Sequence, residues 1–218
     1  FRGNQFQVIP NGIDLKQFRF SKSVREECRR QLGLEQYILI GHVGNFVEQK
    51  NHIFLLDFFT ELLKKCPACR LLLIGTGILE MEIRCKVKQQ GIENEVIFLG
   101  RKSDVYRYLQ AMDLFILPSL YEGFPLSLVE AQAAGLPCLV SDQISTQVNI
   151  MGRVKYLPIY DMKVWIDAIK SFEPETKWRE NNITRCYEQI SEAGYDIFRN
   201  VKRLEEIYTK YYEDNNSL

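Results

Sequence analysis

Two carboxylates, Glu122 and Glu130, flank a segment rich in glycine and proline, with seven residues between them. An apolar run at 113–118 precedes this segment, and helix-forming residues at 131–134 follow it. This order predicts a buried strand, a loop and the start of a helix, which is where α/β proteins bind anions and nucleotides. Amides around 124–127, together with the helix dipole, would hold a phosphate. Glu130, more than one turn into the helix, suits neutral hydroxyls such as those of a ribose.

Two further loops carry residues that suit the same ligand. The loop at 41–51 contains glycines, which allow close backbone approach, and Lys50, which can pair with a phosphate just before a helix. The small polar loop Gly75-Thr76-Gly77 follows another strand-like run. Because all three loops follow strands, we expect them to converge on one edge of a sheet.

Other chemistries have little support in the sequence. The third glycine of a dinucleotide-binding turn is replaced by Glu80, and there is no Walker-type lysine loop. The histidines are His42 and His52, and no Gly-x-Ser-x-Gly elbow is present, which argues against a Ser/His/Asp nucleophile. We expect His42 to be a strand or core-edge residue and His52 to pack or cap at a helix N-terminus.

The elements that must position these loops alternate along the chain. Apolar strand-like runs occur at 6–9, 37–43, 70–74, 96–99, 114–117, 137–140 and 155–157, and helical patterns fall between them at 22–32, 51–65, 78–90, 104–111 and 125–134. Strands rich in Val, Ile and Leu without alternation predict a parallel sheet covered on both faces. The fold class is therefore α/β, with a Rossmann-like, doubly wound parallel sheet.

After about residue 161 the alternation ends, and helices are expected at 162–172, about 177–190 and 196–212. We expect one domain over 1–218, with a core at about 6–160 and a helical C-terminal tail at about 161–213. The last helix carries an apolar stripe, which by default predicts a buried face; its members are Ile197, Val201, Leu204, Ile207, Tyr208 and Tyr211.

Composition excludes several classes of protein. The 218 residues are 46% apolar and 26% charged, which is typical of globular proteins. The 28 basic and 28 acidic residues balance, so we expect no nucleic-acid partner and only local phosphate recognition. The Cys66-x-x-Cys69 pair follows a helix, the wrong end for a redox thiolate, and has no second ligand pair for zinc. We expect reduced thiols and no metal site.

The segment at 118–137, with its Glu122-x7-Glu130 spacing, resembles the signature of retaining glycosyltransferases of family 4, the group 1 glycosyltransferases. These enzymes have the two-domain GT-B fold. Segments at 9–14, 43–51, 72–77 and 96–100 match in order, so the resemblance covers about 6–142 and more loosely the tail to about 212. The chain is most similar in character to bacterial enzymes that build capsular polysaccharides or exopolysaccharides.

The resemblance implies that this chain is one half of a GT-B protein, the C-terminal domain that binds a nucleoside diphosphate sugar, either UDP- or GDP-linked. Pro10-Asn11-Gly12 resembles the interdomain connection, so the N-terminal acceptor domain would precede Phe1, and this chain alone is expected to be inactive. The implied reaction transfers a hexosyl group to a hydroxyl of a glycan or a lipid-linked sugar, without a metal or other cofactor. The implied location is cytoplasmic, with peripheral attachment of the full-length protein to the inner membrane face.

The resemblance also assigns roles to individual residues. Lys50 would neutralise the donor diphosphate, Glu130 would hold the ribose, and Glu122 with the amides at 123–126 would contact the transferred sugar and distal phosphate. Lys50 and Glu122 are thus the candidate catalytic residues, and the base would lie near 75–77 and 100–102. The full set of candidate donor-binding residues is Gly44, Asn45, Lys50, Gly75, Thr76, Gly77, Arg101, Lys102, Glu122, Gly123, Phe124, Pro125, Leu126 and Glu130.

One position departs from the family pattern. Asn45 stands where the family commonly carries an arginine that binds the pyrophosphate. Asparagine can donate a hydrogen bond but supplies no charge, so stabilisation of the leaving group would be weaker or shared with Arg101 or Lys102. Two alternatives to the enzyme therefore stay open: a non-catalytic module that binds a nucleotide sugar, and a plain Rossmann-type binding or interaction protein. The family's last helix commonly crosses to the other domain, which is the alternative to a buried stripe in the tail.

Overall fold

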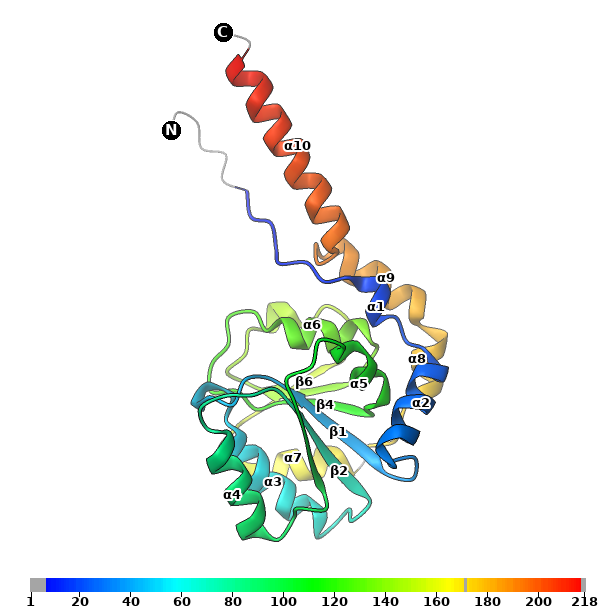
Figure 1. The fold of residues 1–218 in the computed structure, drawn as a ribbon, viewed down its shortest axis with the longest axis vertical. Coiled ribbons are helices and arrows are strands. Elements are labelled where there is room, and N and C mark those ends of the chain that lie inside the picture. The colour runs from blue at the N-terminus through cyan, green and yellow to red at the C-terminus, as the bar shows by residue number, and fades with distance from the viewer. Residues whose placement is uncertain (1–6, 171, 217–218) are drawn as a thin grey trace.

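The computed structural model describes residues 7–170 and 172–216, which form a six-stranded parallel sheet in the order β3-β2-β1-β4-β5-β6 (Figure 1). The strands are β1 Ile38–Val43, β2 Cys69–Ile74, β3 Val96–Gly100, β4 Leu114–Leu117, β5 Cys138–Ser141 and β6 Val154–Leu157. The strand order reverses between β1 and β4, which pair in parallel through Ile40 and Gly41. This confirms the predicted Rossmann-like, doubly wound sheet and gives it one switch point.

Both faces of the sheet are apolar and both are covered. On β2, Leu71 and Leu73 face one core, whereas Leu72 and Ile74 face the other. Helices α3 His52–Leu63, α4 Glu80–Gln90 and α7 Met162–Lys170 cover the first face (Figure 1). The second face is covered by α1 Leu15–Phe18, α5 Val105–Ala111, α6 Leu126–Ala133 and α9 Ile183–Glu192, with α2 Lys22–Leu32 packed beside α5. Because both sides of each strand are buried, the strands read as continuous apolar runs.

Two predicted elements differ in the structure. The strand expected at 6–9 is wrong: residues 7–9 have no regular structure, and Phe6 lies outside the described residues. This segment runs beside α10 Ile197–Asn216, where Asn200 Nδ2 donates to the carbonyl of Pro10 at 2.8 Å (Figure 1). The helix expected at about 177–190 is two helices, α8 Thr176–Asn181 and α9, because Asn182 leaves the helical conformation and bonds back to the Trp178 carbonyl.

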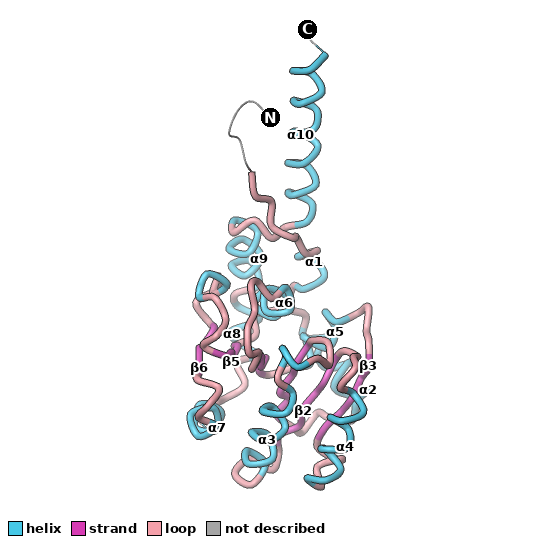
Figure 2. The backbone as a smooth tube through the Cα atoms, turned by 90° about the vertical axis from the view of Figure 1, so that its left-hand side faces the viewer, coloured by secondary structure: helices cyan, strands magenta, loops and turns pink. Residues whose placement is uncertain are grey.

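The tail begins inside the core and ends outside it. Trp165 of α7 and Ile190 of α9 are fully buried, whereas α10 projects from the body of the molecule (Figure 2). Val201 is 46% exposed and Tyr208 69%, so the expectation of a buried stripe is wrong. The apolar face of α10 is left uncovered, as in the alternative. In the part of the chain described, no helix joins the length and the apolar character needed to span a membrane.

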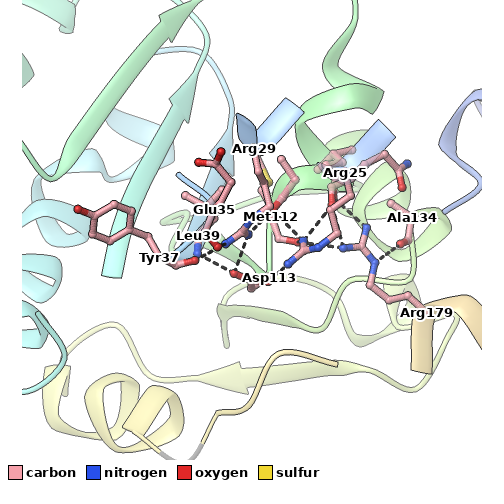
Figure 3. Close-up of polar contacts among 12 residues, drawn as sticks. Arg25, Arg29, Glu35, Tyr37, Leu39, Met112, Asp113, Ala134 and Arg179 are labelled. Carbon is pink, nitrogen blue, oxygen red and sulfur yellow. Dashed lines mark hydrogen bonds and ion pairs between the residues drawn. The ribbon is translucent and has the colours of Figure 1, made fainter. Parts of the chain in front are cut away.

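Three buried arginines close the end of the sheet opposite the predicted loops (Figure 3). Arg25 and Arg29 of α2 pair with the carboxylate of Asp113, which also accepts from the Leu39 amide at 2.8 Å. Arg179 of α8 donates to carbonyls at the C-terminus of α5, and burial lowers the pKa of its guanidinium. Because carbonyls at a helix C-terminus carry partial negative charge, they supply much of the counter-charge for these cations.

Candidate functional site

The loops that follow β1 and β4 meet at the switch point of the sheet. The first contains the short 3₁₀ helix η1 Glu48–Lys50, and the second runs from Pro118 to the start of α6. The Leu120 amide donates to the Gln49 carbonyl at 2.8 Å, and Gln49 Nε2 donates to the Tyr121 carbonyl at 2.9 Å. The two predicted site loops are therefore joined directly, backbone to backbone and side chain to backbone.

The two candidate catalytic side chains contact each other at this junction. Lys50 Nζ forms an ion pair with Glu122 Oε1, and Ser119 Oγ donates to the same oxygen at 3.0 Å. Their side chains are only 15% and 9% exposed, so water screens this pair less than a surface pair. The resemblance assigned these two groups to different parts of the donor, and their direct pairing is not visible from the sequence.

Gly44 makes room for the lysine. A Cβ atom at this position would lie 3.2 Å from both Cδ and Cε of Lys50 and 3.0 Å from Nε2 of His42. A side chain here would make the stem of Lys50 or the ring of His42 shift by a few tenths of an ångström. The absence of a side chain at Gly44 thus lets Lys50 pack closely against the end of β1.

Gly75 and Gly77 allow the β2 loop to support the β1 loop from the side. A Cβ atom on Gly75 would lie 2.0 Å from the carbonyl oxygen of Gly44, and one on Gly77 2.4 Å from that of Phe46. The Phe46 amide also donates to the Thr76 carbonyl at 3.0 Å. These contacts explain the two glycines by backbone packing, and a donor contact at 75–77 stays a prediction.

The start of α6 presents unused backbone donors. Pro125 is the N-cap, with no side-chain capping bond. Glu122 forms a parallel backbone bridge with Ile144, and within the described residues the amides of Phe124, Leu126 and Ser127 have no hydrogen-bond acceptor. A helix N-terminus with free amides attracts an anion, as the sequence predicted for this loop.

Phe124 fixes the same loop to the tail of the chain. Its ring stacks on Tyr195, in the α9–α10 connection, with centroids 4.9 Å apart and an angle of 11° between the planes. The sequence analysis missed this contact, because the two residues are far apart in sequence and neither carries a recognisable pattern. The stack joins the loop that precedes α6 to the connection between α9 and α10.

Glu130 lies on α6, just over one turn beyond the free amides. Burial raises the pKa of its carboxyl group from 4.5 to about 7. Its carboxylate accepts no hydrogen bond from any residue that the structure describes. A partly buried carboxylate without a protein donor, close to free amides, suits a ligand that brings both hydroxyls and phosphate.

His42 and His52 form a buried pair behind the Lys50 loop, with ring centroids 4.7 Å apart. His42 Nδ1 donates to the Ile116 carbonyl at 3.0 Å, while the other three ring nitrogens have no partner among the described residues. Burial lowers the pKa of His42 to about 4 and that of His52 to about 2. Both rings are therefore neutral near pH 7 and act as packing residues, as expected from the sequence.

The remaining candidates lie at the edge of the site. Asn45 is exposed and makes no side-chain hydrogen bond to the described residues. Arg101 and Lys102 follow β3, and the Lys102 ammonium lies 5.8 Å from the ring centroid of Tyr108. Because β2 separates β3 from β1, the backbones of these two strands are about 10 Å apart. Stabilisation of the leaving group by Arg101 or Lys102, in place of the charge that Asn45 lacks, stays a prediction.

Comparison with known proteins gives the family. The family model "Glycosyl transferases group 1" matches residues 24–188, more than half of the chain. EpsF of Bacillus subtilis is 36% identical over 204 residues, covering 92% of this chain and 52% of that protein. The UDP-Gal:alpha-D-GlcNAc-diphosphoundecaprenol alpha-1,3-galactosyltransferase of Escherichia coli is 26% identical over 210 residues, covering 94% of this chain and 54% of that protein.

A solved structure agrees on the fold. Anabaena Alr3699/HepE in complex with UDP-glucose superposes with a TM-score of 0.71 at 23% identity, covering 94% of this chain and 57% of that one. The chain thus spans about half the length of the proteins that it matches. The sheet order, the placement of the loops and the match over residues 24–188 together show that this chain belongs to the group 1 glycosyltransferases.

Proposed function

We propose that this chain is the donor-binding domain of a retaining glycosyltransferase of family 4. The enzyme transfers a hexosyl group from a UDP- or GDP-sugar to a hydroxyl of a glycan or lipid-linked sugar. The observation that carries this proposal is the meeting of Lys50 with the loop that leads to the free amides of α6. One cation and several amides at a switch point are the groups that a diphosphate needs.

In this proposal the chain acts by holding the leaving group. Lys50 and the amides of Phe124, Leu126 and Ser127 stabilise the negative charge that grows on the diphosphate as the sugar departs. In this proposal these groups neutralise the diphosphate charge, a task for which other enzymes use a metal ion. Glu130 accepts hydrogen bonds from the ribose hydroxyls, and Glu122 contacts the transferred sugar. Positioning of the donor against the acceptor supplies the rest.

The relatives support the substrate class. HepE binds UDP-glucose in its crystal structure, and the Escherichia coli relative is named for a UDP-galactose donor and an acceptor linked to diphosphoundecaprenol. Since this chain spans about half of such proteins, we propose an N-terminal acceptor domain in the whole protein and a role in polysaccharide biosynthesis. We further propose a cytoplasmic location with peripheral attachment to the inner membrane face.

Titration calorimetry with UDP-glucose, UDP-galactose and GDP-mannose tests the donor site on this chain. Wild type should show saturable binding to at least one donor, and Lys50→Ala and Glu130→Ala should each weaken it about tenfold or more. Lys64→Ala is the matched control, because Lys64 caps the C-terminus of α3 and forms an exposed ion pair with Glu61. Absence of saturable binding contradicts the donor-domain proposal, whereas unchanged affinity in both site variants removes the site assignment.

Asn45 favours a second candidate, a module that binds a nucleotide sugar without transferring it. The residue is exposed at the β1 loop and supplies no charge where the family commonly has arginine. Donor hydrolysis or transfer by the full-length protein separates the enzyme from this module. The third alternative, a Rossmann-type interaction protein, has no support from the comparisons.

A further inference from the structure

The ion pair between Lys50 and Glu122 sets a condition for any diphosphate that binds there. Each group is mostly buried, and each is the other's only charged partner among the described residues. The remaining hydrogen bond to the Glu122 carboxylate comes from the neutral hydroxyl of Ser119. A diphosphate at Lys50 therefore has to compete with a carboxylate that already matches the lysine's charge.

Displacement of Glu122 has a cost of its own. A carboxylate at 9% exposure that loses its cation stays poorly hydrated, and a diphosphate beside it adds repulsion between like charges. The Ser119 hydroxyl supplies only one donor, and in the proposed function the free amides at the start of α6 bind the phosphate. New hydroxyl donors are needed to satisfy the carboxylate again, and a sugar attached to the diphosphate carries them.

We propose that Glu122 is a specificity-determining residue that makes this site prefer a nucleoside diphosphate bearing a sugar over the same nucleoside diphosphate alone. The inference rests on the proposed function of the same site. When the sugar-bearing donor binds, the ion pair between Lys50 and Glu122 breaks. Lys50 then pairs with the diphosphate, and the Glu122 carboxylate accepts hydrogen bonds from the sugar hydroxyls. After transfer the hydroxyls leave with the sugar, Glu122 returns to Lys50, and the product diphosphate is expelled.

The test compares the affinity of each protein for UDP and UDP-glucose, or for GDP and GDP-mannose if wild type binds only those. Glu122→Gln keeps the size and hydrogen-bonding capacity of the side chain but removes its charge. We expect the variant to bind the bare diphosphate about tenfold more tightly, which corresponds to about 1.4 kcal/mol of binding free energy. Its affinity for the sugar-bearing donor should change less than about threefold, so the preference for the sugar collapses.

Glu61→Gln is the control, because it removes a carboxylate from an exposed ion pair on α3, and both affinities should stay at the wild-type value. Glu122→Ala is the second variant, which should also gain affinity for the bare diphosphate but lose affinity for the sugar-bearing donor. Thermal unfolding confirms that each variant is folded. If both Glu122 variants bind the diphosphate no better than wild type, the inference is overturned while the donor site stands. If wild type binds no nucleotide, the proposed function itself is overturned.

Discussion

Replacement of Glu130 by glutamine should stabilise the protein at alkaline pH. Burial raises the pKa of this carboxyl group to about 7, whereas in the unfolded chain it titrates near 4.5. Between these values the folded state holds a proton that the unfolded state has released. The wild-type free energy of unfolding therefore falls as the pH rises from about 4.5 to 7, and the loss is complete above 7.

The size of the effect follows from the two values. Each factor of ten in the proton affinity is worth about 1.4 kcal/mol, so the full loss is about 3 kcal/mol. Glutamine does not ionise and avoids this loss. We expect the free energy of unfolding of Glu130→Gln to exceed that of wild type by up to about 3 kcal/mol at pH 8. At pH 4.5 the two values should agree within about 1 kcal/mol. The difference at pH 8 is large for a domain whose total stability is about 5–15 kcal/mol.

Urea denaturation of both proteins at pH 4.5, 6 and 8, without nucleotide, measures this difference directly. Effects of pH on the rest of the chain cancel between the variants, and Glu61→Gln, at an exposed site, should show no pH-dependent difference. A Glu130→Gln advantage of equal size at all three pH values would refute the reasoning. In the proposed function the same variant loses donor affinity, so stability is given up for binding at this position.

Three other substitutions test separate features. Asp113→Asn leaves two buried guanidinium groups without their carboxylate, so chemical denaturation should show a loss of about 3–5 kcal/mol, and a loss under about 1 kcal/mol would contradict the cluster's role. Asn45→Arg adds a cation to the β1 loop and should tighten binding of UDP or GDP severalfold at low ionic strength, with the gain lost in high salt; no gain at low salt counts against the site. His52→Phe removes ring nitrogens that lack partners, and because burial lowers the pKa of His52 to about 2, wild type loses stability below pH 6.5. The free energy of unfolding of the variant should fall less than that of wild type between pH 6.5 and 4. An equal dependence on pH in the two proteins would refute this.

The sheet was predictable because its signals are local. The run at 114–117 is apolar at every position and that at 70–74 at every position after Arg70. Helix ends such as Gly91, with φ of 66°, carry glycine where a left-handed conformation is needed. The expected strand at 6–9 failed because an apolar pair there can lie along a helix as easily as in a sheet. The tail stripe failed because helical periodicity identifies an apolar face but not what covers it.

The site was predictable to the level of its loops and no further. The topology rule brings the β1 and β4 loops to one edge, and the structure joins them there. The pairing of Lys50 with Glu122 and the stack of Phe124 on Tyr195 depend on side-chain conformations across 72 and 71 positions of sequence, which no local pattern encodes. The buried arginines had a partial signal, since Arg25 and Arg29 lie four residues apart on one helix face, but Arg179 had none.

The place of Arg179 in the chain has a consequence for biosynthesis. All six strands have been synthesised once residue 157 has left the ribosome, yet the carbonyls of Leu109 and Ala134 receive their side-chain donor from Arg179 of α8. A nascent chain that stops between these points holds a complete sheet but lacks the residue that donates to both carbonyls. We therefore expect this end of the domain to close only after translation has passed the sheet.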